Sequence, residues 1–231
     1  MVDHKHSTWS PNVQGPEVKS GSGTVDIAPV SRQQERSDLS TRRLLQATAT
    51  LIVERGYERM TMVDIGKRAG YSHGLVTQRF GNKANLLATL WERMSSRFGP
   101  ERIFDLVGGR TGIDAIQSIL LEIAQDAQRS PDDLRAFYAL LFEATKPIPE
   151  LQDHIRNATR AYRDMIADLM AAGTRAGTVR DDIDPELLTD VVLDSLRGAT
   201  YHWMLDPQRA DVTLRLQRLS DHFGRVYRTK T

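Results

Sequence analysis

The sequence of 231 residues contains no cysteine, few aromatic residues and no long apolar run. Without cysteine, the chain can form neither a disulfide nor a thiolate metal site. No stretch approaches the roughly 18 apolar residues that a membrane-spanning helix needs. Residues 1–30 also lack the apolar centre of a signal peptide. We therefore expect a cytoplasmic protein that does not enter a membrane.

The sequence also lacks the motifs of catalysis and of cofactor binding. It has no glycine-rich phosphate loop and no nucleophile elbow. None of its histidines has a metal-ligand spacing within a predicted helix. These histidines are His4, His6, His73, His154, His202 and His222. We therefore predict a protein that is not an enzyme and has no cofactor and no metal site.

The net charge of +1 conceals an uneven distribution along the chain. Residues 31–98 carry twelve Lys and Arg against six Asp and Glu, whereas residues 99–231 carry seventeen against twenty-one. A basic segment joined to an acidic one is typical of a DNA-binding head on a body that stays off DNA. A solvated helix surface would give the same pattern, so charge alone does not separate the two interpretations.

The spacing of apolar residues predicts an all-α fold. From Ser37 onward the period is helical and no alternating strand pattern appears. Helices are predicted over 37–55, 61–69, 72–80 and 83–98, with about five more to residue 227. Residues 1–36 are rich in Gly, Ser, Pro and Gln and predict a disordered tail. In that tail, Arg32 and Arg36 would either reach a minor groove as an arm or remain solvated.

The segment from Met60 to Lys83 has the layout of a helix-turn-helix. Two short helices flank Gly70, which tolerates the positive φ that the turn requires. Gly66 is small enough for the helices to approach closely. The apolar residues expected to pin the pair to a supporting helix are Val63, Ile65, Val76 and Phe80. A helical corner in any all-α protein would share this spacing, but the basic charge of the segment favours DNA.

The second short helix is polar along one side, where a DNA reader must approach the bases. His73, Gly74, Thr77 and Gln78 are polar or small and lie near its start. Glutamine is a natural bidentate partner of adenine, and His or Thr can reach base edges or phosphates. Lys83, at the start of the next helix, adds a cation for the phosphate backbone.

Residues Arg42 to Met94 resemble the DNA-binding domain of TetR-family transcriptional regulators. The matching pieces are Glu54-Arg55-Gly56-Tyr57, Thr61-Met62-Val63-Asp64-Ile65-Gly66, Arg68-Ala69-Gly70-Tyr71-Ser72 and Phe80-Gly81-Asn82-Lys83. The resemblance implies a three-helix reader at 37–82, with a connecting helix at 83–98 in a regulatory and dimerisation domain that covers 83–231. This chain departs from the family at Thr77, where a tyrosine usually touches a phosphate, and at Gly66, where alanine is usual.

The family resemblance implies a homodimer that binds double-stranded DNA at a near-palindromic site. Thr61, Arg79 and Lys83 would hold phosphates. The expected function is a repressor released by a small apolar or aromatic ligand. The alternative is a dimeric DNA-binding protein without a small ligand, controlled by protein partners.

The body would supply both the dimer contact and the ligand pocket. The last two helices offer apolar residues for a four-helix bundle with a partner, although a monomer core would show the same face. They are Leu187, Val191, Val192, Leu196, Leu214, Leu216 and Leu219. The pocket is expected among aromatic, Met and Leu side chains, which ordinary core packing would also use. They are Phe104, Leu120, Phe137, Leu141, Tyr162, Met165, Met170 and Trp203.

Overall fold

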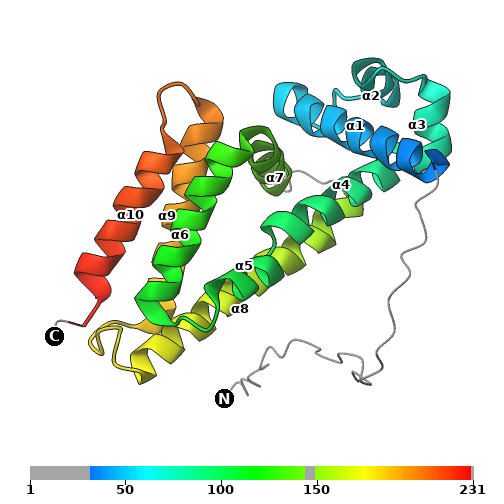
Figure 1. Ribbon diagram of the computed structural model, residues 1–231. Helices are drawn as coiled ribbons and strands as arrows, with labels where there is room; N and C mark the ends of the chain where they lie inside the picture. Colours follow the sequence, from blue (N-terminus) through cyan, green and yellow to red (C-terminus); the bar gives the residue numbers. More distant parts are fainter. Residues whose placement is uncertain (1–31, 144–148, 230–231) are drawn as a thin grey trace, which may run out of the picture.

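The computed structural model describes residues 32–143 and 149–229, which are almost entirely helical (Figure 1). The predicted all-α fold is therefore confirmed. The helices are α1 (Arg32–Arg55), α2 (Met62–Ala69), α3 (His73–Phe80), α4 (Lys83–Phe98), α5 (Pro100–Val107), α6 (Gly112–Arg129), α7 (Pro131–Glu143), α8 (Pro149–Arg175), α9 (Pro185–Leu205) and α10 (Val212–Tyr227). Within the described ranges, no helix is both long and apolar enough to cross a membrane.

Helices α1, α2 and α3 form a head at one end of the molecule (Figure 1). Thr61 and Asp64 form a reciprocal cap at the start of α2, with amide-to-side-chain distances of 3.1 and 3.2 Å. Gly70 ends α2 in the left-handed region at φ 78°, and Ser72 caps α3. These caps set the turn between the two helices at the predicted residues.

Gly66 lies where α2 and α3 meet most closely. A Cβ atom at this position would lie 2.9 Å from the carbonyl oxygen of Tyr71 and 3.1 Å from Val76. Val76 and Ile65 are fully buried beneath this contact. Val63 is 57% exposed, so the prediction that it pins the pair was wrong. It stands two residues from Ile65, which turns its side chain to the opposite side of the helix.

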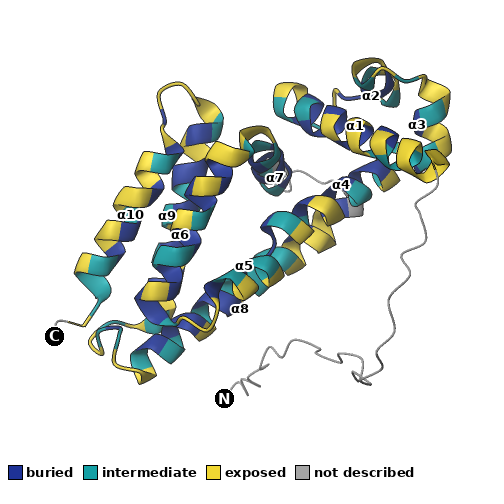
Figure 2. Ribbon diagram, in the orientation of Figure 1, coloured by how far each residue is buried: buried dark blue, intermediate teal, exposed yellow. Residues whose placement is uncertain are grey.

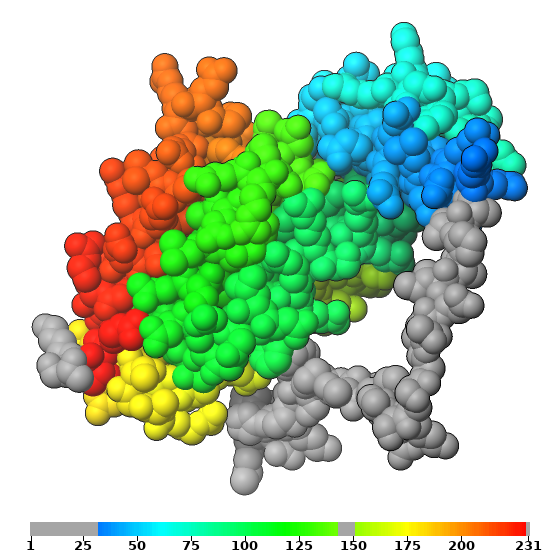
Figure 3. All heavy atoms as spheres, in the orientation of Figure 1, coloured from blue at the N-terminus to red at the C-terminus, as the bar shows by residue number. Residues whose placement is uncertain are grey.

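Helix α4 leads from the head into the body, which consists of α5 to α10. Helices α5 and α8 pack against α4 (Figure 1). Helix α10 packs along α6, and α9 contacts both α8 and α10. Helix α7 contacts α1 of the head as well as α4 and α9. The buried residues face the spaces between these helices (Figure 2), and the head is in direct contact with the body (Figure 3). Both α4 and α7 therefore connect the two parts.

The start of α1 differs from the predicted boundary. The helix begins at Arg32, so residues 32–36, which we assigned to the tail, belong to α1. Gln34 donates to Asp38 at 3.0 Å along this exposed turn. Arg, Gln and Glu are good helix formers, but they carry no apolar period, so the pattern does not reveal the first turn. The rest of the predicted tail lies outside the described residues.

Two further differences concern proline and glycine in the body. Helix α4 ends before Gly99-Pro100, as predicted. Pro100 also begins α5, a helix that the residue pattern did not predict. Gly173 lies inside α8, although glycine is unfavourable within a helix. A Cβ atom there would lie 2.3 Å from the Cα of Gly112, at the start of α6. Close packing of the backbones, and not a turn, requires this glycine.

Candidate DNA-binding surface and ligand cavity

Four residues predicted to face DNA lie exposed on α3. They are His73, Gly74, Thr77 and Gln78. The Thr77 hydroxyl lies 3.4 Å from the His73 ring nitrogen. On the other side of the helix, Val76 and Phe80 are buried against the head. This arrangement leaves one short polar face of α3 accessible, as insertion into a major groove requires.

Arg79 holds α3 against the first helix. Its guanidinium donates to the carbonyl oxygen of Ser37 at 2.8 Å and to the Ser37 hydroxyl at 2.7 Å. It also donates to the Thr41 hydroxyl at 2.7 Å. The resemblance to the family predicted that Arg79 contacts a DNA phosphate. The structure shows that the same guanidinium nitrogen already has three partners in α1.

Lys83 and Thr61, also assigned to phosphates, have internal partners as well. The Lys83 ammonium donates to the Tyr57 carbonyl at 2.6 Å and lies 3.9 Å from the centre of the Tyr57 ring. The Thr61 hydroxyl belongs to the α2 cap, where its hydrogen bond lowers the pKa of Asp64. Phosphate contacts by Lys83 and Thr61 remain predictions. Like Arg79, both side chains already stabilise the head.

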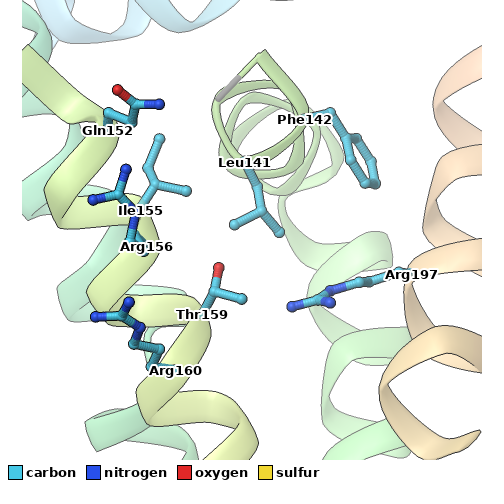
Figure 4. A pocket seen from close by; sticks show the side chains of 8 residues that line it. All are labelled: Leu141, Phe142, Gln152, Ile155, Arg156, Thr159, Arg160 and Arg197. Carbon is cyan, nitrogen blue, oxygen red and sulfur yellow. The ribbon is translucent and has the colours of Figure 1, made fainter. Parts of the chain in front are cut away.

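The body contains two adjoining cavities between α7, α8 and α9. The outer one has a volume of about 540 Å³ and opens to solvent. The inner one is only about 40 Å³. Leu141, Thr159 and Arg197 line both and therefore form their boundary. Figure 4 shows the outer cavity, with the Arg197 side chain reaching from α9 toward α8.

The residues predicted for a single pocket are separated by the structure. Phe137, Leu141 and Tyr162 line the inner cavity. Phe104 and Met165 instead line a separate depression of about 350 Å³ between α5 and α8. Leu120, Trp203 and Met170 are buried in the core and line none of these cavities.

Several lining residues were not predicted from the sequence. They include Ile123, Tyr138, Thr159, Leu193, Leu196 and Arg197. The choice of candidates by residue type passed over Thr159 and Arg197, and it also omitted Tyr138 although that residue is aromatic. Arg197 had one available signal, since it is the only Lys or Arg in α9.

The inner cavity is linked to α4 by aromatic contacts and one hydrogen bond. The Phe137 ring stacks on Trp91 with 5.8 Å between centroids and lies 5.6 Å from Phe98. The Tyr162 hydroxyl donates to the Phe98 carbonyl oxygen at the end of α4. Burial raises the pKa of the Tyr162 phenol, so this hydroxyl keeps its proton. Two residues that line the cavity, Phe137 and Tyr162, therefore contact α4, the helix that carries the head.

A group of charged side chains joins α5 to α6. Arg102 contacts Glu122 at 2.9 Å and Asp126 at 3.7 Å. Asp126 is almost fully buried, and burial raises its pKa despite the nearby Arg102. Within the ranges that the structure covers, no group of three His, Asp or Glu side chains is arranged to hold a metal ion.

Family models match both parts of the chain. Residues 44–90 match the model described as bacterial regulatory proteins, tetR family. Residues 112–227 match the model described as BetI-type transcriptional repressor, C-terminal. The two matches fall on the head with α4 and on the body.

Individual relatives and solved structures agree with the family models. The fatty acid metabolism regulator protein of Bacillus subtilis is 20% identical over 170 residues, covering 74% of this chain and 86% of that protein. Among solved structures, the fatty acid degradation regulator FadR from Bacillus halodurans has a TM-score of 0.66 at 18% identity, covering 80% and 94% of the two chains. The SmeT–triclosan complex has a TM-score of 0.67 at 19% identity, covering 83% and 92%. These structural likenesses show the fold.

Proposed function

Because this chain belongs to the TetR family of bacterial transcriptional regulators, we propose that it is a homodimeric repressor released from its operator by a small ligand. The repressor role is supported by the match of the body to a repressor C-terminal domain. The operator would be near-palindromic, because a two-fold dimer presents two copies of α3 to successive major grooves.

The exposed face of α3 supports sequence-specific reading. Gln78 and His73 would contact base edges, while Thr77 would contact a base or a neighbouring phosphate. Arg79 would act from behind this face, because its hydrogen bonds to Ser37 and Thr41 fix the position of α3 on the head.

The surface of α9 and α10 supports the dimer. Leu187 is 60% exposed and Leu214 is 41% exposed, which leaves two large apolar side chains for a partner to cover. Val191 and Leu219 are partly buried. Val192, Leu196 and Leu216, also considered for the interface, are buried within the protomer. The interface would therefore use the outer side of both helices.

The observation that carries a ligand response is the contact of Phe137 and Tyr162 with α4. The inner cavity of about 40 Å³ is close to the space of one water molecule, roughly 30 Å³. A larger apolar group can enter only if these side chains move. Because both contact α4, such a ligand would favour a different position of α4 and of the head. A ligand releases DNA only through such a difference in affinity between two states.

The alternative is a DNA-binding dimer controlled by protein partners, without a small ligand. It predicts a filled body, whereas the body has an outer cavity of about 540 Å³ that adjoins the inner one. The structural neighbour SmeT forms a complex with triclosan, which supports a small molecule as effector.

The proposal is tested with purified protein and labelled DNA from upstream of its own coding region. Binding is measured across a range of salt concentrations against random competitor DNA, and then in the presence of small apolar and amphipathic compounds. We expect competitor-resistant binding with a steep salt dependence, followed by release with one class of compound. Equal binding to both DNAs, here and in a genome-wide selection of bound fragments, would reject a sequence-specific repressor.

A further inference from the structure

Arg197 occupies the boundary between the outer and inner cavities. Its side chain extends from α9 toward Thr159 of α8 (Figure 4). Both residues line the open outer space and the narrow inner one. A molecule that passes from the outer cavity into the inner one therefore meets the guanidinium group and the Thr159 hydroxyl.

The charge at this boundary is positive, and none of the described lining residues neutralises it. Among the described residues that line either cavity, none has a carboxylate side chain. The side chain of Arg197 forms no hydrogen bond or ion pair with any described residue. Arg156, on α8, pairs with Asp153 at 2.8 Å, whereas Arg160 on the same helix adds a further positive charge to the outer cavity. A half-buried guanidinium without a partner is a strong site for an organic anion.

The inner cavity is largely apolar, in contrast to the positive charge at its boundary. Its walls are largely the apolar side chains of Ile123, Leu193, Leu196, Leu141 and Phe137. Tyr138 and Tyr162 are also present, and burial raises the pKa of both phenols, so they stay neutral. The Tyr162 hydroxyl already donates to the Phe98 carbonyl oxygen. Beyond Arg197 and Thr159 at its boundary, the inner cavity therefore suits a hydrocarbon or aromatic group.

We propose that the effector is an amphipathic organic anion. Its carboxylate accepts hydrogen bonds from the Arg197 guanidinium and the Thr159 hydroxyl, and its apolar portion enters between Phe137 and Tyr162. This inference rests on the proposed ligand response and adds the charge and orientation of the ligand. The anion keeps the molecule at the boundary, so that only the apolar part can displace the side chains that contact α4.

The inference is tested by calorimetric titration of the full-length protein with three probes that share one alkyl chain. The probes are decanoate, decanol and decyltrimethylammonium. We expect decanoate to bind at least about tenfold more tightly than decanol, and the cation to bind most weakly. Equal affinity of decanoate and decanol, tighter binding of the cation, or no binding of any probe would overturn the inference.

Two substitutions at the boundary and one matched control locate the anion site. Arg197→Gln should reduce the preference for decanoate over decanol to about onefold, while the affinity for decanol stays unchanged. Thr159→Val should reduce the preference by a smaller factor. Arg43→Gln removes an exposed arginine from α1, away from both cavities, and should leave the preference intact. Circular dichroism verifies that each variant is folded. An unchanged preference in folded Arg197→Gln would overturn the proposal.

A separate measurement distinguishes failure of this inference from failure of the proposed function. Each probe is added to the protein–DNA complex. If decanoate binds in an Arg197-dependent manner but leaves DNA bound, the ligand class stands and the release function fails. If decanol releases DNA as well as decanoate does, the release function stands and the anionic class is overturned.

Discussion

The guanidinium of Arg79 in α3 is hydrogen-bonded to the carbonyl oxygen and the hydroxyl of Ser37 in α1. This contact joins the reading helix to a helix more than forty positions earlier in the chain. It fixes α3 on the side opposite its exposed polar face. We therefore propose that Arg79 positions α3 and makes no phosphate contact.

The first prediction follows from this contact. Arg79→Met should lower stability by about 1 to 3 kcal/mol, because hydrogen bonds from a charged group are lost. It should weaken binding to all DNA sequences because α3 loses its position. The slope of affinity against salt should stay unchanged, since no phosphate contact is removed. Urea denaturation and salt-dependent DNA titration measure the two effects.

The control removes the partners and keeps the arginine. The double variant Ser37→Ala with Thr41→Val should weaken DNA binding in the same direction as Arg79→Met. If Arg79→Met instead lowers the salt slope by about 0.9 for each protomer on the DNA, the guanidinium contacts a phosphate and the positioning role is wrong.

The second prediction concerns base readout by Gln78, which is exposed on α3. Gln78→Ala should relax the preference for one base pair in each half-site, by about 1 to 3 kcal/mol. The salt slope should remain that of the wild type. Selection of bound sequences from a random library, carried out with both proteins, shows the change. Unaltered affinity and preference would remove Gln78 from the readout.

Local chemistry made the head predictable. Thr61, Gly70 and Ser72 act within a few residues of their own position, so the caps and the turn can be predicted from sequence neighbours. The partners of Arg79 lie in another helix, and no local pattern reveals them. A positive charge near a reading helix is therefore ambiguous until its distance to other acceptors is known.

The cavity was less predictable for a related reason. Phe137 and Tyr162 both line the inner cavity, whereas Phe104 and Trp203, grouped with them on residue type alone, do not. Whether an aromatic ring lines a space or fills the core depends on how helices from distant parts of the chain pack. The helical period gives the buried side of each helix, but it does not give its neighbour.

The third prediction concerns the close contact at Gly66. Alanine is the better helix former by about 1 kcal/mol, but its Cβ would lie 2.9 Å from the Tyr71 carbonyl oxygen. Overpacking typically costs about 1 to 3 kcal/mol. Gly66→Ala should therefore be neutral or destabilising, and it should weaken DNA binding because α3 is displaced.

Gly198 in α9 is a matched control for this substitution. A Cβ atom there would meet nothing within 4 Å, so Gly198→Ala should gain up to about 1 kcal/mol. Urea denaturation of both variants at one protein concentration measures the difference. A Gly66→Ala protein as stabilised as the Gly198→Ala protein would show that α2 and α3 do not pack this closely.

The last prediction separates ligand binding from ligand response. Tyr162→Phe removes the hydrogen bond to the Phe98 carbonyl oxygen but keeps the ring that lines the inner cavity. The variant should bind an effector with nearly the wild-type affinity. Because one of the two connections from the cavity to α4 is lost, the effector should release DNA less efficiently. A coupling reduced by about 1 kcal/mol corresponds to a roughly fivefold smaller change in DNA affinity.

Leu141→Ala provides the comparison for Tyr162→Phe. Leu141 lines both cavities but makes neither the aromatic stack nor the hydrogen bond to α4. The Leu141→Ala variant should weaken effector binding. It should leave unchanged the ratio between DNA affinity without effector and DNA affinity at saturating effector. DNA affinity is measured with and without saturating effector for each protein. If both variants reduce that ratio equally, the signal reaches α4 through general packing, and Tyr162 has no special part in it.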